Sequence, residues 1–168
     1  FSSFDYDYVK TRTDLEYKKK NFILSDKIYN EILISIKNEF NKINKKNFDT
    51  DFYQIIIGPW LRFFIYQFVN KYKTMVEVIK NYNVEKCTIY DSKKLLFYVD
   101  DSASFHHAPN NNNWNFGMYS YILENLKTKI NFNKIIPENN LLFSPNINKN
   151  ISKNFFKIFL NYISKIIP

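Results

Sequence analysis

Apolar residues recur at helical spacing in the first half of the chain and predict a first long helix. Ser25 is a favourable N-cap and Asp26 suits a helix N-terminus, so we expect this helix to begin at Ser25 and to end near residues 46–47. Its apolar face is formed by Ile28, Ile32, Ile36, Phe40 and Ile43. Residues 1–24 show no clear period, and we expect the lysines at 18–20 in a solvated turn.

A second helical region is predicted for residues 50–82. Its apolar stripe alternates spacings of three and four and consists of Ile57, Leu61, Phe64, Phe68, Tyr72, Met75 and Ile79. Pro59 predicts a kink or the start of a new helix within this region. Residues 55–69 are strongly apolar but too short to cross a bilayer comfortably, and Arg62 would lie within it. We therefore expect a buried core helix here.

The remaining elements are shorter. Residues 86–90 are rich in strand formers and predict a strand, whereas residues 95–99 fit a second strand or a packed loop. Residues 100–113 are polar and predict a loop. An amphipathic helix follows from Trp114 to Leu126, then a connection at 129–150 and a last helix capped by Ser152. This order predicts an α/β fold in which helices dominate.

Composition and charge narrow the class of protein. Hydrophobic residues make up 45% of the chain and aromatic residues 19%, which indicates a globular domain. The 2 glycines argue against a glycine-rich phosphate loop. Cys87 is the single cysteine, which excludes an internal disulfide; we expect a buried structural thiol and a reducing cytoplasm.

The net charge of +8 comes almost entirely from lysine, and Arg12 and Arg62 are the only arginines. Proteins that read nucleic acids favour arginine for bidentate contacts, so a solvated lysine-rich surface is the simpler interpretation. The chain opens on Phe1 and closes on the apolar residues 166–168. We interpret residues 1–168 as a single, truncated domain.

Three segments resemble a family of transferases found in bacterial surface-polysaccharide loci. Residues 52–65, FYQIIIGPWLRFFI, are similar to its YW-x-I-(I/L)-(I/L)-G-P-W-L signature, although Gln54 follows Tyr53 where the family often has Trp. Residues 70–76 approximate its YDRY-x-x-(I/L) stretch, with Asn70-Lys71 in place of Asp-Arg. Residues 113–123, NWNFGMYSYIL, are similar to its D-x-W-N-x-x-(L/M)-Y-S-x-I-L pattern. The resemblance covers roughly residues 20–128.

The resemblance implies a longer protein with two Rossmann-like halves, similar to GT-B glycosyltransferases. The present chain would be a helix-rich part of the N-terminal half and inactive alone. A missing C-terminal domain would hold the nucleotide-sugar donor, so no cofactor is expected in this part. The acceptor would be a glycan or a lipid-linked glycan. The protein would be cytoplasmic, without a transmembrane segment, and associated peripherally with the inner membrane.

Four polar residues near the predicted strand at 95–99 are the candidate catalytic groups: Asp100, Asp101, His106 and His107. Ligands of open α/β sheets bind beyond the carboxyl ends of strands. Glycosyl transfer needs a base for the acceptor hydroxyl, which Asp or His supplies. A solvated polar loop is the alternative. Adjacent histidines point apart, so we expect no metal site.

Four further residues are candidates for substrate binding: Arg62, Trp60, Trp114 and Asn115. Arg62 after Gly58-Pro59 would clamp an anion, or, in the structural alternative, pair with a carboxylate beside a packed Trp60. Trp114 would stack on a sugar ring and Asn115 would bind its hydroxyls, with helix-start packing as the alternative.

Two other functions remain open at this point. Basic charge and many aromatic rings would also suit a module that binds single-stranded nucleic acid through stacking and phosphate contacts. The scarcity of arginine argues against it, and we expect no nucleic-acid partner. A non-catalytic helical scaffold is the third possibility.

Overall fold

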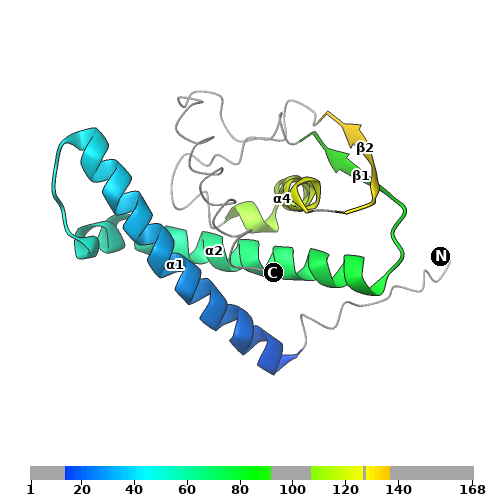
Figure 1. The fold of residues 1–168 in the computed structure, drawn as a ribbon, viewed down its shortest axis with the longest axis horizontal. Coiled ribbons are helices and arrows are strands. Elements are labelled where there is room, and N and C mark those ends of the chain that lie inside the picture. Colours follow the sequence, from blue (N-terminus) through cyan, green and yellow to red (C-terminus); the bar gives the residue numbers. More distant parts are fainter. Residues whose placement is uncertain (1–13, 92–106, 127, 137–168) are drawn as a thin grey trace.

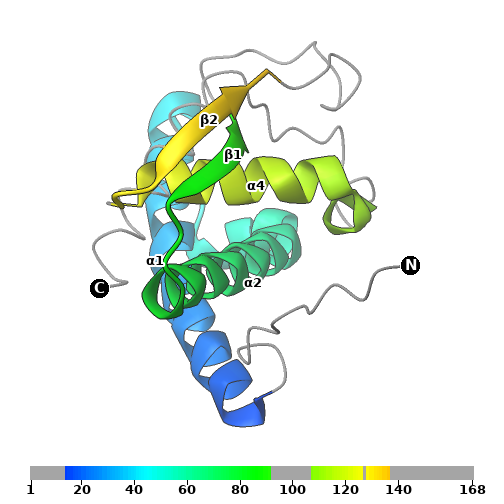
Figure 2. The same cartoon turned by 90° about the vertical axis from the view of Figure 1, so that its right-hand side faces the viewer.

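The computed structural model describes residues 14–91, 107–126 and 128–136. Its elements stack in layers, with the sheet on α4, α4 on α2, and α1 crossing α2 obliquely on the far side (Figures 1 and 2). In chain order they are α1 (Leu15–Asn44), α2 (Thr50–Asn81), β1 (Lys86–Tyr90), η3 (Ala108–Asn110), α4 (Asn112–Asn125) and β2 (Asn131–Ile135). The helix-dominated arrangement with a small parallel sheet is compatible with the predicted α/β class.

Helix α1 begins ten residues earlier than the pattern predicted. Asp14 caps it, because its carboxylate accepts the backbone amides of Glu16 and Tyr17 at 2.8 and 3.3 Å. Ser25 lies inside the helix, and its hydroxyl donates to the Asn21 carbonyl at 2.7 Å, so the prediction that it caps the helix was wrong. The lysines at 18–20 are exposed on α1 rather than in a turn.

The turn between α1 and α2 is organised by one asparagine. The Asn41 side-chain nitrogen donates a hydrogen bond to the Phe48 carbonyl at 2.8 Å. The Asn41 side-chain oxygen accepts a hydrogen bond from the Phe48 backbone N–H at 3.0 Å. The Tyr53 hydroxyl donates a hydrogen bond to the same Asn41 oxygen at 2.9 Å. Lys45 ends α1 in the left-handed conformation, with φ of 53°. The end of α1 is thus within two residues of the predicted position.

Helix α2 runs through Pro59 without interruption, so no new helix starts there. Proline removes one amide donor and crowds the carbonyl four residues back, here that of Ile55. The Ile55 side chain is 79% exposed, which places this turn at the surface, where water can solvate the carbonyl. The helix therefore tolerates the loss of the hydrogen bond that Pro59 removes.

Gly58 allows α1 and α2 to approach closely. It is buried, and a Cβ at this position would lie 2.7 Å from the Tyr29 hydroxyl oxygen. The Tyr29 ring in turn lies beneath Arg62, whose guanidinium carbon is 4.2 Å from the ring centroid. We call this contact among Gly58, Arg62 and Tyr29 the helix crossing.

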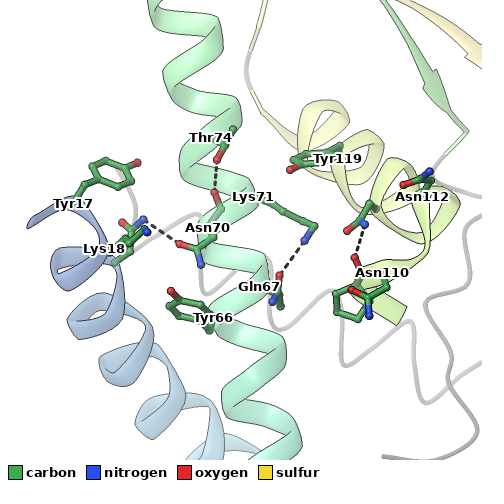
Figure 3. A pocket seen from close by; sticks show the side chains of 13 residues that line it. Tyr17, Lys18, Tyr66, Gln67, Asn70, Lys71, Thr74, Asn110, Asn112 and Tyr119 are labelled. Carbon is green, nitrogen blue, oxygen red and sulfur yellow. Dashed lines mark hydrogen bonds between the residues drawn. The ribbon is translucent and has the colours of Figure 1, made fainter. Parts of the chain in front are cut away.

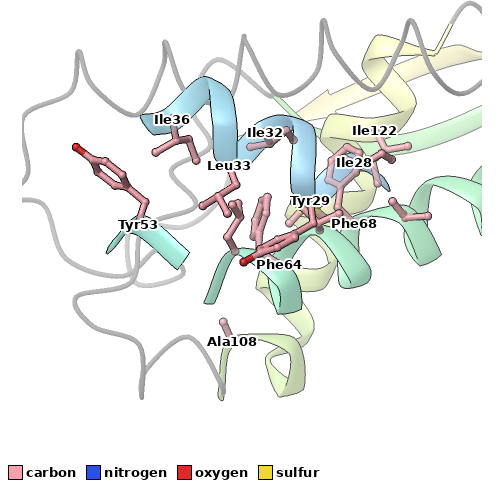
Figure 4. Close-up of a cluster of buried hydrophobic side chains, with 14 of the residues drawn as sticks. Ile28, Tyr29, Ile32, Leu33, Ile36, Tyr53, Phe64, Phe68, Ala108 and Ile122 are labelled. Atoms are coloured by element: carbon pink, nitrogen blue, oxygen red, sulfur yellow. The ribbon is translucent and has the colours of Figure 1, made fainter. Parts of the chain in front are cut away.

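One hydrophobic core joins α1, α2, η3 and α4 (Figure 4). Of the apolar face predicted for α1, Ile28, Ile32 and Ile36 are buried, whereas Phe40 and Ile43 are exposed near the turn. The described part of α2 contributes the buried residues Tyr53, Leu61, Phe64, Ile65, Phe68 and Val69. The second half of the apolar segment 55–69 is thus core, as predicted, while Ile55 and Ile56 face solvent.

Strands β1 and β2 pair in parallel, with Lys86 opposite Asn131 and Tyr90 opposite Ile135. Residues 86–90 form β1 as predicted. Strand β2 falls in a segment predicted to be a connection, because Asn131, Asn133 and Lys134 are weak strand formers and exposed. Helix α4 connects the two strands, which makes a βαβ unit.

Ser120 fastens α4 to the sheet. Its fully buried hydroxyl donates to the Phe116 carbonyl at 2.7 Å and accepts the Tyr90 amide at 3.0 Å. The Tyr90 and Phe116 rings meet edge to face at 4.6 Å between centroids. The end of β1 is therefore held on α4 by both a polar and an aromatic contact.

Two predicted elements, the strand or loop at 95–99 and the helix after Ser152, lie outside the described residues. Cys87 is half-buried rather than fully buried, and burial raises the pKa of its thiol. Within the described ranges, no helix is long and apolar enough to cross a membrane.

Candidate functional site

A polar groove of about 600 Å³ runs over one face of α2. Helix α1 forms one wall, and η3 with the first half of α4 forms the other (Figure 3). We call it the α2 groove. Its floor consists of Tyr66, Gln67, Asn70, Lys71 and Thr74, and its walls consist of Tyr17, Lys18, Asn21, Pro109, Asn110, Asn112, Asn115 and Tyr119.

Lys71 is the most unusual residue of the groove, because only 6% of it is exposed. Its ammonium donates to the Gln67 side chain at 3.2 Å. The same nitrogen lies 5.5 Å from the Trp114 ring centroid and 5.9 Å from that of Tyr119. A buried ammonium requires such compensation. The contacts hold the charge at the boundary between α2 and α4.

On the other wall, amide groups join α1 to α2. Asn21 is buried and donates to the Asn70 side chain at 3.2 Å, and Thr74 donates to the Asn70 carbonyl at 2.8 Å. Tyr17 hydrogen-bonds Asn21; burial raises the pKa of the Tyr17 phenol, and the Glu77 carboxylate adds to the rise, although the Asn21 bond opposes it. This wall thus presents amide and phenol groups between α1 and α2.

The α4 wall is fixed by asparagines. Asn111 caps α4 by accepting the backbone amides of Asn113 and Trp114 at 2.9 and 3.0 Å. Asn115 donates to the Pro109 carbonyl at 2.7 Å, which ties α4 to η3. Asn112 and Asn110 are exposed and line the groove. The amide side chains of this wall therefore lie on the hydrogen-bonded N-terminus of α4.

The groove has a definite chemical character. Among the described residues that line it, six of 13 are amides and three are tyrosines. Both charged lining residues are lysines, and no carboxylate is found among the described side chains that line it. Amides donate and accept hydrogen bonds, so they match hydroxyl groups, while tyrosine rings offer apolar faces. The lining suits a polyhydroxylated ligand.

Two of the four predicted substrate-binding residues lie at this groove. Asn115 lines it, and Trp114, with 1% of its surface exposed, lies beneath the Lys71 ammonium. A buried ring cannot present its face to a sugar, so Trp114 supports Lys71 instead. The other two predicted residues lie elsewhere on α2.

Arg62 and Trp60 belong to the neighbourhood of the helix crossing. Arg62 forms an ion pair with Asp26, and both side chains remain about half exposed. Trp60 is half-buried and stacks on Phe64 with 5.7 Å between ring centroids. Neither residue lines the α2 groove.

Of the predicted catalytic residues, Asp100, Asp101 and His106 lie outside the described residues. His107 is exposed directly before η3, whose Pro109 and Asn110 line the groove. Among the residues that the structure describes, no group of three or more His, Cys, Asp or Glu is placed to hold a metal ion.

The sequence pattern did not single out Lys71, Tyr66 or Asn21 for binding. Each is one polar residue on a long helix, where a solvated position is the usual outcome. The available signal was a lysine near the apolar stripe of α2, beside Tyr72 of that stripe. Such a lysine is buried only when neighbouring elements supply partners, which a single-helix pattern does not reveal.

Residues 2–167 match a protein family described as the LIC12162 family transferase. The match extends over nearly the whole chain and so includes the helix crossing, the α2 groove and the βαβ unit alike. No curated protein and no solved structure matches the chain.

Proposed function

The chain belongs to the LIC12162 family of transferases, and we propose that it acts as a glycosyltransferase in bacterial surface-carbohydrate biosynthesis. In this proposal the α2 groove binds the glycan acceptor. The observation that carries it is the groove lining, with six amides and three tyrosines over one face of α2. Membership in a transferase family also favours this function over a nucleic-acid module or an inert scaffold.

We propose further that the chain is part of the N-terminal, Rossmann-like half of a GT-B-type enzyme. The β1–α4–β2 unit supports this, because parallel strands joined by a helix are the repeating unit of such domains. The nucleotide-sugar donor would then bind mainly to a second domain. The groove residues would position the acceptor for transfer.

The base for the acceptor hydroxyl is proposed among Asp100, Asp101, His106 and His107. His107 supports this proposal by its place in the chain, two residues before Pro109 of the groove wall. General base catalysis would require the chosen residue to come within hydrogen-bond reach of the acceptor hydroxyl.

The direct test is a transfer assay on the intact protein. Nucleotide sugars are supplied with lipid-linked glycan acceptors, and acceptor-dependent release of the nucleoside diphosphate is measured. Tyr66→Ala should lower this rate about tenfold, because it removes an aromatic face from the groove floor. The matched control is Tyr82→Ala, since Tyr82 is exposed at the end of α2 and outside the groove.

The control variant should keep the rate of the unaltered protein. Equal loss of activity in the Tyr66 and Tyr82 variants would contradict the placement of the acceptor in the groove. Absence of acceptor-dependent release with every nucleotide sugar would contradict glycosyl transfer itself.

A further inference from the structure

The charge of the α2 groove carries information beyond its shape. Lys18 stands on the α1 wall and Lys71 on the floor near α4, so positive charge is present on both sides. No described side chain lining the groove is acidic. A concave site lined by one sign of charge concentrates the electric field and draws ligands of the opposite sign.

Lys71 is also ordered in advance of binding. A free lysine side chain loses considerable rotamer entropy when a ligand fixes it. Here the stem is buried within the helical layer, the ammonium donates a hydrogen bond to the Gln67 side chain, and two aromatic rings lie within 6 Å of the nitrogen. The charge is therefore held at one place, in surroundings of low dielectric that strengthen an ionic hydrogen bond.

Groups that recognise hydroxyls surround the same place. Figure 3 shows the Lys71 side chain directed toward Gln67, with Tyr119 and Asn110 on the side of the groove that α4 and η3 form. Asn115 lines the groove from the adjoining turn of α4. The positive end of the α4 dipole, at the turn that carries Asn112 and Asn115, adds to the potential of the lysine. An oxyanion and its neighbouring hydroxyls would thus meet cation and amides together.

From these features we propose that the α2 groove selects an anionic carbohydrate, whose oxyanion binds the Lys71 ammonium. This inference rests on the proposed function, because it specifies the class of glycan that enters the same groove. The oxyanion is the phosphate of a sugar phosphate or the carboxylate of a uronic acid. A neutral sugar of the same shape would make the amide contacts and lose the ionic one.

The test uses the intact protein labelled with fluorotryptophan, because the Trp114 ring lies beneath Lys71. Its fluorine NMR resonance is assigned with Trp114→Phe and titrated with glucose phosphate, glucuronate and neutral methyl glucoside. The anionic sugars should bind at least about tenfold more tightly than the glucoside, as expected for a hydrogen bond between charged groups. The two anionic titrations distinguish phosphate from carboxylate.

Two variants separate charge from fold. Lys71→Met should abolish the preference for anions, whereas Lys71→Arg should retain most of it. The control is Lys80→Met, an exposed lysine in the last turn of the same helix, which should leave the preference unchanged. Without any substitution, the affinity for glucose phosphate should fall as salt rises, while that for the glucoside should stay constant.

The outcomes distinguish the two proposals. Equal affinity for charged and neutral sugars, insensitive to salt, would overturn the anion preference and leave the groove as a carbohydrate site. A Trp114 resonance that responds to none of the three sugars would overturn both the preference and the placement of the glycan in the groove.

Discussion

Two stretches of α2 lie less than three turns apart and serve different purposes. At the helix crossing, the absence of a side chain at Gly58 leaves room for the Tyr29 hydroxyl of α1, and the Arg62 guanidinium packs over the Tyr29 ring. In the α2 groove, Tyr66, Asn70 and Lys71 form part of the floor of an amide-lined cavity. The same helix therefore serves as a packing surface first and as the floor of a binding site next.

The difference shows that a conspicuous motif need not mark a binding site. The GPWLR segment is the most distinctive part of the sequence, yet its Arg62 contacts Tyr29 and Asp26, and its Trp60 stacks on Phe64. The groove instead collects polar residues from four separate elements, α1, α2, η3 and α4. We therefore expect ligand binding to depend on the groove residues and helix packing to depend on the GPWLR segment.

The largest expected effect comes from comparing two aromatic residues of α2 that lie two positions apart, Tyr66 and Phe68. Phe68→Ala should destabilise the protein by about 3–5 kcal/mol, because Phe68 is fully buried and its removal leaves a cavity. Tyr66→Ala, at the groove, should cost less than about 1 kcal/mol yet weaken sugar binding. Urea unfolding and titration with glucose phosphate measure the two effects. Similar stabilities for both variants would erase the distinction between the regions.

Gly58→Ala should destabilise the protein by about 1–3 kcal/mol, because the new Cβ would press on the Tyr29 hydroxyl. At an uncrowded helix position the same change would stabilise by up to about 1 kcal/mol. Combining it with Tyr29→Phe removes the obstructing oxygen and should recover most of the loss. Thermal unfolding of the two single variants and the double variant measures the coupling. Additive effects would show that Gly58 is not needed for the close approach.

A smaller effect is expected at high pH. Burial, and secondarily the Glu124 carboxylate, raises the pKa of Tyr121 to about 12, from 10.0. The unfolded chain ionises first, so stability is complete below about pH 10 and falls as the pH approaches 12. Because Tyr121 is only partly buried, the loss should be about 1 kcal/mol. In the Tyr121→Phe variant, the free energy of unfolding should change less between pH 10 and pH 12. An unchanged pH dependence would show that Tyr121 does not cause the loss of stability.

The smallest effect is expected for the ion pair at the crossing. Asp26→Asn should lower stability by less than about 1 kcal/mol, because both partners are about half exposed. The difference should shrink further in high salt, since the salt screens the pair. Denaturant unfolding at two ionic strengths measures it. A loss of several kcal/mol that persists in salt would mean that the pair is a principal support of the crossing.

The sequence pattern predicted α2, β1 and α4 well, because each combines a strong period or composition with a clear start. It missed ten residues of α1, where Asn21 and Ser25 interrupt the apolar face and are buried by hydrogen bonds instead. Strand β2 was missed because its partner, rather than its own residues, determines its conformation. The groove was not predicted because it also depends on contacts between elements. Lys71 packs against Trp114 and Tyr119, which belong to another helix.

The most direct test of the central claim compares two cations of α2 by calorimetry. The intact protein and its Lys71→Met and Arg62→Met variants are titrated with glucose phosphate. If the groove binds the ligand, Lys71→Met should weaken binding by about tenfold or more and Arg62→Met by less than about twofold. The reverse order would contradict the account and assign ligand binding to the helix crossing.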